Sequence, residues 1–194
     1  MQHSHAAHPL DMFCHCPHCG SKRFVIHNFK SKHCEDCGFT YYANPSAANV
    51  AFITRMVEGH VPGEGPHEEL LVVRRGKEPA KDTLDLPGGF TDADETGENG
   101  VIREVKEETG LTVTRAAYLF SIPNIYRYSG MDISTLDMFF RCFVNETDDV
   151  QAMDDAEDAR WIAVSDLRPE DFGLRSVREG VRRFLSLCQG TEEV

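Results

Sequence analysis

The sequence predicts an α/β fold in which helices cover both faces of a mixed β-sheet, preceded by a small metal-binding ribbon. Three observations support this prediction. Apolar and β-branched runs such as Leu70–Arg75 and Thr135–Val144 have the length and composition of strands. Two segments, ending near Gly110 and Cys188, carry apolar residues at helical spacing. Two C-x-x-C pairs close to the N-terminus have the spacing of a structural zinc site.

The length and charge of the chain limit its organisation. Its 194 residues predict one main domain and a small satellite. We divide them into a flexible or disordered lead-in (1–13), a zinc ribbon (14–43) and a larger main domain (44–190). The net charge of −12 argues against a general binder of nucleic acids or anionic membranes. No apolar run approaches the ~20 residues of a membrane span, and the polar N-terminus does not resemble a signal peptide, so we expect a cytoplasmic protein.

The N-terminal ribbon is defined by cysteines. Four thiolates at this spacing form the closed tetrahedral shell of a structural Zn²⁺ site. Cys14 lies two residues before the first pair, so an exchange of ligands remains open. Basic residues make the segment locally positive, and a nucleic-acid-binding ribbon therefore competes with a purely structural one. The expected zinc ligands are Cys16, Cys19, Cys34 and Cys37.

The main domain begins at Asn44–Pro45, a turn or boundary signal. Thr135–Val144 is nearly continuously apolar, so we expect it in the centre of the sheet. A glycine- and proline-rich loop is expected over Gly59–Pro66, and a closing amphipathic helix over Ser176–Cys188. The remaining apolar runs predict strands at Phe24–Phe29, Ala47–Val57, Leu70–Arg75, Leu84–Leu86, Leu111–Phe120 and Arg160–Val164.

The other expected helix, ending at Gly110, is rich in carboxylates. Its three glutamates Glu104, Glu107 and Glu108 share one face, because residues three and four apart are neighbours on a helix. Like charges at these spacings cost roughly 0.2–0.5 kcal/mol per pair. A hard cation such as Mg²⁺ or Mn²⁺ would turn this repulsion into a ligand set. The alternative is an ordinary solvated acidic face.

The segment from Gly89 to Leu111 resembles the Nudix box, G-x5-E-x7-R-E-U-x-E-E-x-G-U with U aliphatic, at every fixed position. The resemblance implies a Nudix α/β/α sandwich and a Mg²⁺-dependent hydrolase. Such an enzyme cleaves the pyrophosphate bond of a nucleoside diphosphate linked to another moiety, such as NADH, FAD or ADP-ribose, and releases a nucleoside monophosphate. A zinc ribbon followed by Y-x-x-P and this box is similar to the NADH pyrophosphatase branch.

The resemblance assigns roles to individual residues. Glu104, Glu107 and Glu108 would hold Mg²⁺ or Mn²⁺, and Arg103 would orient them. Glu157, in the acidic segment before the last expected strand, is the candidate general base or additional metal ligand, with a solvated loop as the alternative.

Substrate contacts are expected from bare backbone, cationic side chains and aromatic rings. Glycines let a diphosphate approach the backbone, an arginine can contact phosphate, and a tyrosine can stack on a base or nicotinamide ring. These residues are Gly88, Gly89, Arg74, Arg75, Tyr126 and Tyr128.

The substrate itself is less well defined. NADH pyrophosphatases carry a serine-glutamine-proline-tryptophan motif after the box. Ser121 and Pro123 match it, whereas Ile122 and Asn124 replace the glutamine and tryptophan. We expect a small-molecule nucleotide substrate, and a homodimer is compatible with the sequence. The alternative function is a non-catalytic nucleotide sensor that acts on a partner through the zinc ribbon.

Overall fold

The structure is a computed structural model, and it describes residues 8–59, 65–128, 130–145, 150 and 156–190. The backbone forms two compact units, Met1–Pro45 and Ser46–Val194. Parts of the expected lead-in (1–7), of the Gly59–Pro66 loop (60–64) and of the acidic segment (151–155) lie outside the described residues. Within the described residues, no helix is long and apolar enough to cross a membrane.

The smaller unit is a three-stranded antiparallel sheet in the order β1-β2-β3, with β1 at Phe24–Asn28, β2 at Ser31–Cys34 and β3 at Thr40–Tyr42. Its core is small: among the described residues, the buried cluster consists of Cys16, Phe24 and Cys34, with Phe39 packed against them. An apolar core of this size leaves the unit dependent on another source of stability.

The segment before this sheet contacts it. Leu10 is 3% exposed, and the Nε2 atom of His8 lies 2.8 Å from the carbonyl oxygen of Asn28. Lys32 Nζ donates a 2.9 Å hydrogen bond to the carbonyl oxygen of Phe13. The described end of the expected lead-in is therefore packed against the ribbon.

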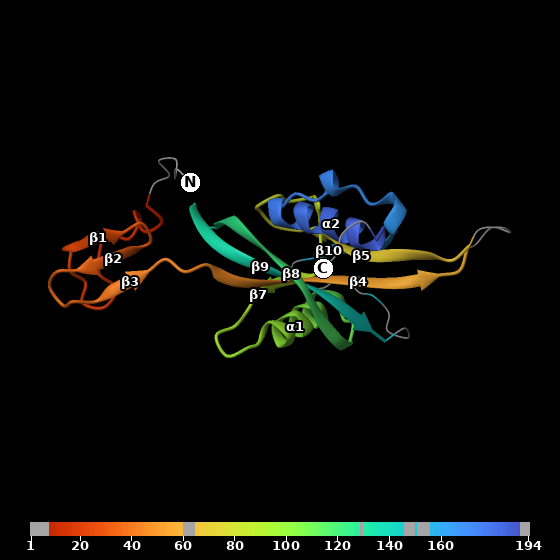
Figure 1. Cartoon of the computed structure of the whole chain (residues 1–194), viewed down its shortest axis with the longest axis horizontal. Coiled ribbons are helices and arrows are strands. Elements are labelled where there is room, and N and C mark those ends of the chain that lie inside the picture. The colour runs from red at the N-terminus through yellow and green to blue at the C-terminus, as the bar shows by residue number, and fades with distance from the viewer. Residues whose placement is uncertain (1–7, 60–64, 129, 146–149, 151–155, 191–194) are drawn as a thin grey trace. The chain divides into compact units, whose positions relative to one another are not determined.

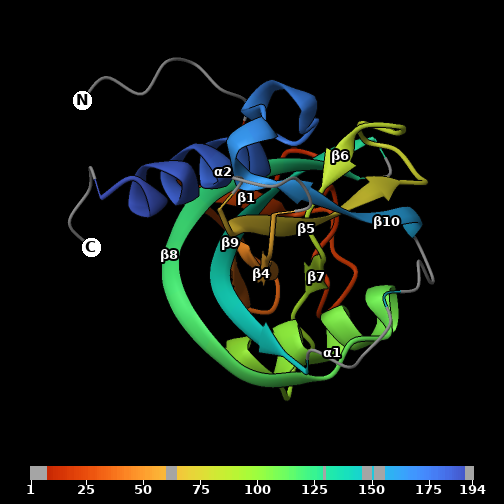
Figure 2. The same ribbon diagram turned by 90° about the vertical axis from the view of Figure 1, so that its right-hand side faces the viewer.

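The larger unit is built around a mixed sheet in the order β10-β5-β4-β9-β8, with β6 beside β5 and β7 beside β4. β4 and β9 pair in parallel, and the remaining pairs are antiparallel. β9 lies between β4 and β8, as its apolar sequence predicts, and β8 forms one edge of the sheet (Figure 2). The strands are β4 (Ser46–Val57), β5 (His67–Arg75), β6 (Leu84–Asp85), β7 (Gly88–Phe90), β8 (Val113–Tyr128), β9 (Met131–Val144) and β10 (Ala156–Ala163).

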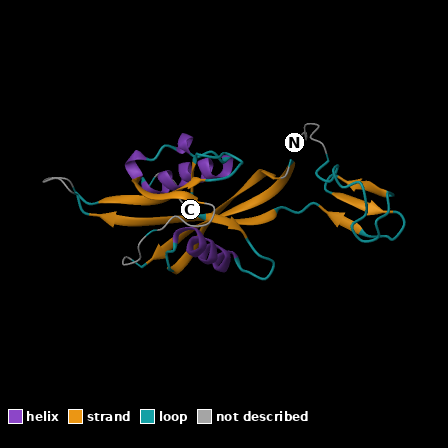
Figure 3. Cartoon of the chain, turned by 180° about the vertical axis from the view of Figure 1, so that it is seen from behind, coloured by secondary structure: helices purple, strands orange, loops and turns teal. Residues whose placement is uncertain are grey.

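Two helices cover opposite faces of this sheet (Figure 1, Figure 3). They are α1 at Gly97–Thr109 and α2 at Arg175–Cys188, and two short 3-10 turns, η1 (Val164–Asp166) and η2 (Pro169–Asp171), precede α2. This arrangement confirms the predicted α/β/α sandwich. Between α1 and the sheet, the buried side chains include Val101 and Val105 of the helix and Ala51, Ile53, Leu71 and Phe140 of the strands. Between α2 and the sheet, they include Val177, Val181 and Phe184 of the helix and Phe52, Val72 and Phe139 of the strands.

Helix α1 ends where the sequence predicts. Gly110 adopts a left-handed conformation (φ 71°), and its N–H bonds to the carbonyl of Lys106. At the other end, the Thr96 hydroxyl accepts a hydrogen bond from the Asn99 N–H at 3.2 Å. Side-chain capping at the start and a left-handed glycine at the end satisfy backbone groups that a helix leaves unpaired.

Strand β8 is longer than predicted. The expected strand ended at Phe120, but β8 continues to Tyr128 and pairs with β9 along that extension. Pro123 lies in the extension opposite Leu136. Because β8 is an edge strand, the missing N–H of a proline can face away from the ladder. The strand therefore carries the segment Ser121–Tyr128 into the same sheet as β4 and β7.

Candidate metal and substrate site

The four predicted zinc ligands form one cluster. Their sulfur atoms all lie within 4.8 Å of one another, with Cys16 to Cys37 at 3.7 Å and Cys19 to Cys34 at 3.6 Å. A tetrahedron with zinc–sulfur bonds of about 2.3 Å has sulfur–sulfur edges of about 3.8 Å. Cys14 is exposed, with its sulfur 3.8 Å from the Met12 carbonyl oxygen, and it does not belong to the cluster. The cluster fits a zinc ion.

Electrostatics in this cluster favour a thiolate at Cys34. Burial acts to raise the pKa of Cys34, but backbone N–H groups of Cys37 and Asp36 and neighbouring thiols lower it to about 7. A thiolate is the form that binds metal. Hydrogen bonds from the backbone of Asp36 and Cys37 therefore favour the metal-binding form of Cys34.

Arg103 organises the carboxylates of α1. Its Nε and Nη2 atoms donate to the two oxygens of Glu95 at 2.7 and 3.0 Å. Its Nη1 donates to Glu104 at 2.8 Å and to Glu107 at 2.9 Å, and Nη2 also donates to the Phe90 carbonyl at 3.0 Å. One guanidinium thus joins three carboxylates to the loop before the helix, and such forked contacts fix side-chain geometry.

These carboxylates differ in environment. Hydrogen bonds from Arg103, foremost, hold the pKa of Glu95 below its ordinary value. Burial raises the pKa of Glu104, while Arg103 acts in the opposite direction. The side chain of Glu104 is 13% exposed and that of Glu107 is 49% exposed. The face therefore runs from a shielded carboxylate to one open to solvent.

The glycine strand β7 lies directly against this carboxylate face. The Gly88 N–H donates to Glu108 Oε2 at 3.1 Å. A Cβ atom added at Gly89 would come within 2.5 Å of Glu104 Oε1, so only glycine leaves room for that carboxylate. Several carboxylate oxygens beside open backbone are the hard-ligand surroundings that suit Mg²⁺ or Mn²⁺.

A cavity of about 650 Å³ brings most of the predicted site residues together. It extends from the carboxylate face of α1 past β7 to the ends of β5, β8 and β9. Its lining includes every predicted substrate contact, the three predicted helix ligands and the arginine expected to orient them: Arg74, Arg75, Gly88, Gly89, Tyr126, Tyr128, Glu104, Glu107, Glu108 and Arg103.

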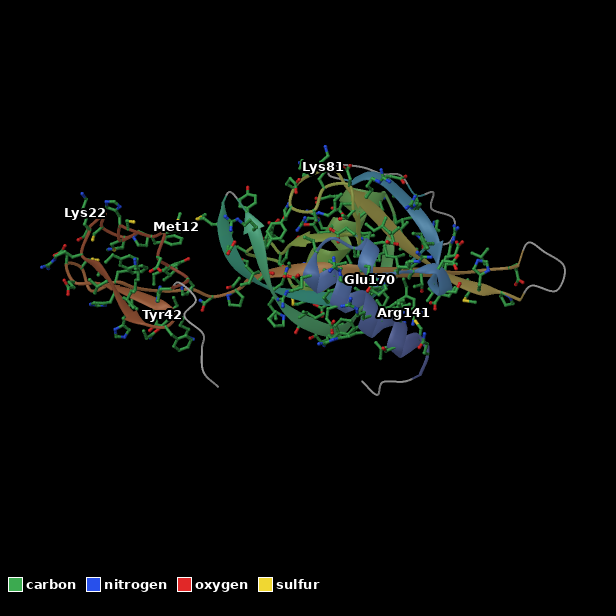
Figure 4. All side chains as sticks on the ribbon, turned by 90° about the horizontal axis from the view of Figure 1, so that it is seen from above. Met12, Lys22, Tyr42, Lys81, Arg141 and Glu170 are labelled. Atoms are coloured by element: carbon green, nitrogen blue, oxygen red, sulfur yellow. The ribbon has the colours of Figure 1, made fainter. Side chains whose placement is uncertain are left out.

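The two predicted arginines have different surroundings. Arg75 is largely buried, forms an ion pair with Asp85 and donates from Nε to the Pro79 carbonyl at 2.7 Å. Arg74 is exposed, and among the described residues no hydrogen bond or ion pair of its side chain is found. The loop that Arg75 braces continues to Lys81, whose side chain projects outward (Figure 4). Arg74 is therefore the arginine available to a phosphate.

The two tyrosines also differ. The Tyr126 ring is half-buried and meets the Phe90 ring edge-on, with centroids 5.8 Å apart. The Tyr128 ring is 57% exposed at the end of β8. The backbone of Glu157 lies at the start of β10, where the strand register shifts between Ala156 and Asp158, opposite Arg75 and Arg74. The structure does not describe the Glu157 side chain.

Sequence reasoning assigned no role to five polar residues that line the same cavity. Each is at most 7% exposed, although four of them belong to strands that read as apolar. Polar residues two apart within one such strand, as at Thr135 and Asp137, were the available signal, since alternate residues share a face. The residues are Asn49, Asp85, Asn124, Thr135 and Asp137.

Comparison with known proteins agrees with this geometry. The NUDIX domain family matches residues 59–184. A protein of Deinococcus radiodurans named NAD-capped RNA hydrolase NudC is 32% identical over 152 residues, which is 78% of this chain and 49% of that protein. A Methanocaldococcus jannaschii protein named ADP-ribose pyrophosphatase is 49% identical over 43 residues, which is 22% of this chain and 25% of that protein.

A solved NUDIX hydrolase from Nitrosomonas europaea shares the fold, with a TM-score of 0.65 at 18% identity over 93% of this chain and 94% of that one. The chain spans about half the length of the NudC protein it matches. Because the family match covers most of the chain and includes the carboxylate helix, this protein belongs to the NUDIX domain family.

Proposed function

We propose that this protein hydrolyses the pyrophosphate bond of a nucleoside diphosphate linked to another moiety and releases a nucleoside monophosphate. One observation carries the proposal: three glutamates on one face of α1 border a glycine strand in a cavity of about 650 Å³. Carboxylates facing a diphosphate would repel it without a cation. Their placement is therefore explained by a divalent ion between them and the substrate.

The chain's own residues perform three tasks in this proposal. Glu104, Glu107 and Glu108 hold the ion. Before the ion binds, Arg103 already fixes the carboxylates of Glu104 and Glu107 through hydrogen bonds. Mg²⁺ or Mn²⁺, when bound, supplies charge neutralisation for the diphosphate and activates a water nucleophile. Gly89 keeps the space beside Glu104 open, so that the phosphates can reach the carboxylate face.

We assign the remaining contacts to the rim of the cavity. The exposed guanidinium of Arg74 contacts a phosphate oxygen, and Tyr126 or Tyr128 stacks on a base or nicotinamide ring. Glu157 acts as general base or additional metal ligand, since β10 begins opposite Arg74 and Arg75, the last two residues of β5.

The names of the relatives narrow the substrate class. Proteins similar to this chain are named for hydrolysing NAD-capped RNA and ADP-ribose. NAD and ADP-ribose both contain a nucleoside joined through a diphosphate to a second ribose. We therefore propose a dinucleotide or nucleoside diphosphate sugar, with NADH, FAD and ADP-ribose as the first candidates.

The ribbon has a structural role in this proposal. Zn²⁺ bound by the four clustered cysteines stabilises a unit whose buried core has three members. The catalytic residues all belong to the second unit, beginning at Ser46.

The test is a substrate panel with Mg²⁺ and Mn²⁺, in which nucleoside monophosphate release is measured from NADH, ADP-ribose, FAD, NAD-capped RNA and nucleoside triphosphates. We expect turnover of at least one member and its loss in Glu107→Gln, with the fold retained. Glu98→Gln is the matched control, because Glu98 is an exposed glutamate on the same helix and outside the cavity. Activity of Glu107→Gln within severalfold of wild type would refute the assignment. Tight binding of one nucleotide without turnover of any would instead support the sensor.

A further inference from the structure

A buried polar cluster lies in the candidate substrate cavity, away from the glutamate helix. Asn124, Thr135 and Asp137 are 6%, 3% and 6% exposed, and all three line the cavity. One Asp137 oxygen accepts a hydrogen bond from Asn124 Nδ2 at 3.1 Å, and the other accepts one from the Thr135 hydroxyl at 2.6 Å. A carboxylate thus faces the cavity with two neutral partners.

The surroundings of Asp137 differ from those of the other buried carboxylate in the cavity. Asp85, the other buried carboxylate of the cavity, has Arg75 as its ion-pair partner. No ion pair joins Asp137 to a cation within the described part of the chain. Burying a carboxylate without further hydrogen bonds is costly. Each of its oxygens offers about two acceptor sites and has one protein donor, so acceptor capacity remains for a ligand.

The position of Asp137 relative to the glutamate helix follows from sheet register. Phe90 on β7 pairs with Ala48 on β4, and Ala48 pairs with Asp137 on β9. Two strand spacings separate β7 from β9, or about 10 Å. Met138 and Phe140 pack on the α1 side, so the alternating side chain of Asp137 faces the α2 side, whereas Glu104 adjoins Gly89 on the α1 side. The cavity reaches both residues, so a substrate that spans it would place its phosphates at the glutamates and the adjoining sugar toward Asp137.

We propose that Asp137, positioned by Asn124 and Thr135, binds the vicinal 2′,3′-diol of the substrate ribose and makes the site specific for ribonucleotides. This inference rests on the proposed function. Each hydroxyl of a diol donates a hydrogen bond to the carboxylate, and the second N–H of the Asn124 amide donates a hydrogen bond to a hydroxyl oxygen. Carboxylates recognise ribose hydroxyls in the same way in dinucleotide-binding folds. A phosphate in place of the 2′-hydroxyl would face buried negative charge and be excluded.

The neighbouring tyrosine fits the same orientation. Tyr126 lies two residues along β8 from Asn124, so both side chains point to one face at a separation of about 7 Å. Its half-buried ring lines the cavity next to the polar cluster. The base carried by the bound ribose therefore has an aromatic surface within reach.

A symmetric substrate tests the inference whichever half enters the cavity. We compare kcat/KM for diadenosine diphosphate and its bis(2′-deoxy) analogue. Wild type is expected to favour the ribose form about 10- to 100-fold, the range for a hydrogen bond to a charged group. Asp137→Asn should reduce this preference below about threefold. Asp132→Asn should retain it, because Asp132 is an exposed aspartate on the same strand, paired with Arg127 at 3.0 Å outside the cavity.

Two further comparisons separate the outcomes. If Asp137→Asn changes the preference for diadenosine over diinosine diphosphate but not the ribose preference, the carboxylate reads the base and the proposal is overturned. If Asp137→Asn does not fold, Asn124→Ala, which removes one donor to the carboxylate, provides the same ratio and is expected to lower it.

Failure of the proposed function gives a different result. If no dinucleotide is hydrolysed, calorimetric titration with AMP and 2′-deoxy-AMP in Mg²⁺ still measures the ribose preference. A wild-type preference for AMP that Asp137→Asn removes supports the diol site without catalysis. Equal affinities for the two nucleotides overturn it.

Discussion

The two candidate metal sites of this protein are built on opposite principles. In the ribbon, four cysteine sulfurs lie within 4.8 Å of one another. On α1, the Arg103 guanidinium already holds Glu95, Glu104 and Glu107 at 2.7–2.9 Å. The cysteine cluster therefore needs its ion for cohesion, whereas the carboxylate site is arranged by the protein before an ion binds.

The difference follows from the task of each site. A structural ion contributes directly to folding where a unit has only a small core. A catalytic ion must leave positions open for substrate, so its ligands are better fixed by protein contacts outside the metal shell. Metal removal should accordingly unfold the ribbon while α1 keeps its packing through Val101 and Val105, both 0% exposed.

The largest expected effect concerns the ribbon. Cys34→Ser replaces a buried thiolate ligand, so the ribbon should lose its zinc and its fold, since zinc binding contributes about 10–16 kcal/mol in small zinc domains. Metal analysis should give a zinc-to-protein ratio near zero, and amide exchange in residues 16–42 should lose protection. Cys14→Ser is the control, because exposed Cys14 lies outside the cluster and should leave the ratio near one. Full zinc content in Cys34→Ser would contradict the comparison.

The next effect is a steric change at the carboxylate site. Gly89→Ala places a methyl group within 2.5 Å of Glu104 Oε1 and must displace that carboxylate. We expect kcat to fall about 100-fold, the loss associated with misplacement of about 1 Å. Gly65→Ala, where an added Cβ meets no atom within 4 Å, should keep wild-type kcat. Unchanged kcat in Gly89→Ala would show that Glu104 does not need its present position.

A smaller effect is expected when the guanidinium of Arg103 is replaced by an ammonium group. Arg103→Lys retains charge but loses the forked contact to Glu95, so kcat or Mg²⁺ affinity should fall roughly 10–100-fold. Arg182→Lys is the control, since Arg182 pairs at 3.0 Å with Glu170, an exposed residue of η2 (Figure 4). Mg²⁺ titrations of activity measure both variants. Equal losses in the two would indicate a general effect of arginine replacement.

The smallest effect concerns the end of α1. Gly110→Ala forces a Cβ into a left-handed conformation at φ 71° and should destabilise the fold by about 1 kcal/mol. Thermal unfolding should shift down by about 2–4 °C. Because Gly110 lies outside the cavity lining, kcat at lower temperature should stay within about twofold of wild type. A large loss of kcat with unchanged stability would instead place Gly110 within the functional site.

The features of this protein that depend on local spacing can be predicted from its sequence. Helical periodicity places Glu104, Glu107 and Glu108 on one face, and Gly110 ends their helix because glycine adopts positive φ readily. The paired C-x-x-C motifs likewise predict the sulfur cluster, since each pair brings two ligands together within one turn.

The way in which distant residues come to line one cavity depends on the pairing of strands in the folded chain. Pairing of β8 with β9 brings Asn124 beside Asp137, and β6 gives Arg75 its partner Asp85, which leaves Arg74 as the exposed arginine. Strand register and ion pairing across a sheet join residues far apart in the chain, and the local pattern around either partner does not specify them. The acidic helix can therefore be predicted from the sequence, whereas the buried polar cluster of Asn124, Thr135 and Asp137 is recognised only in the folded chain.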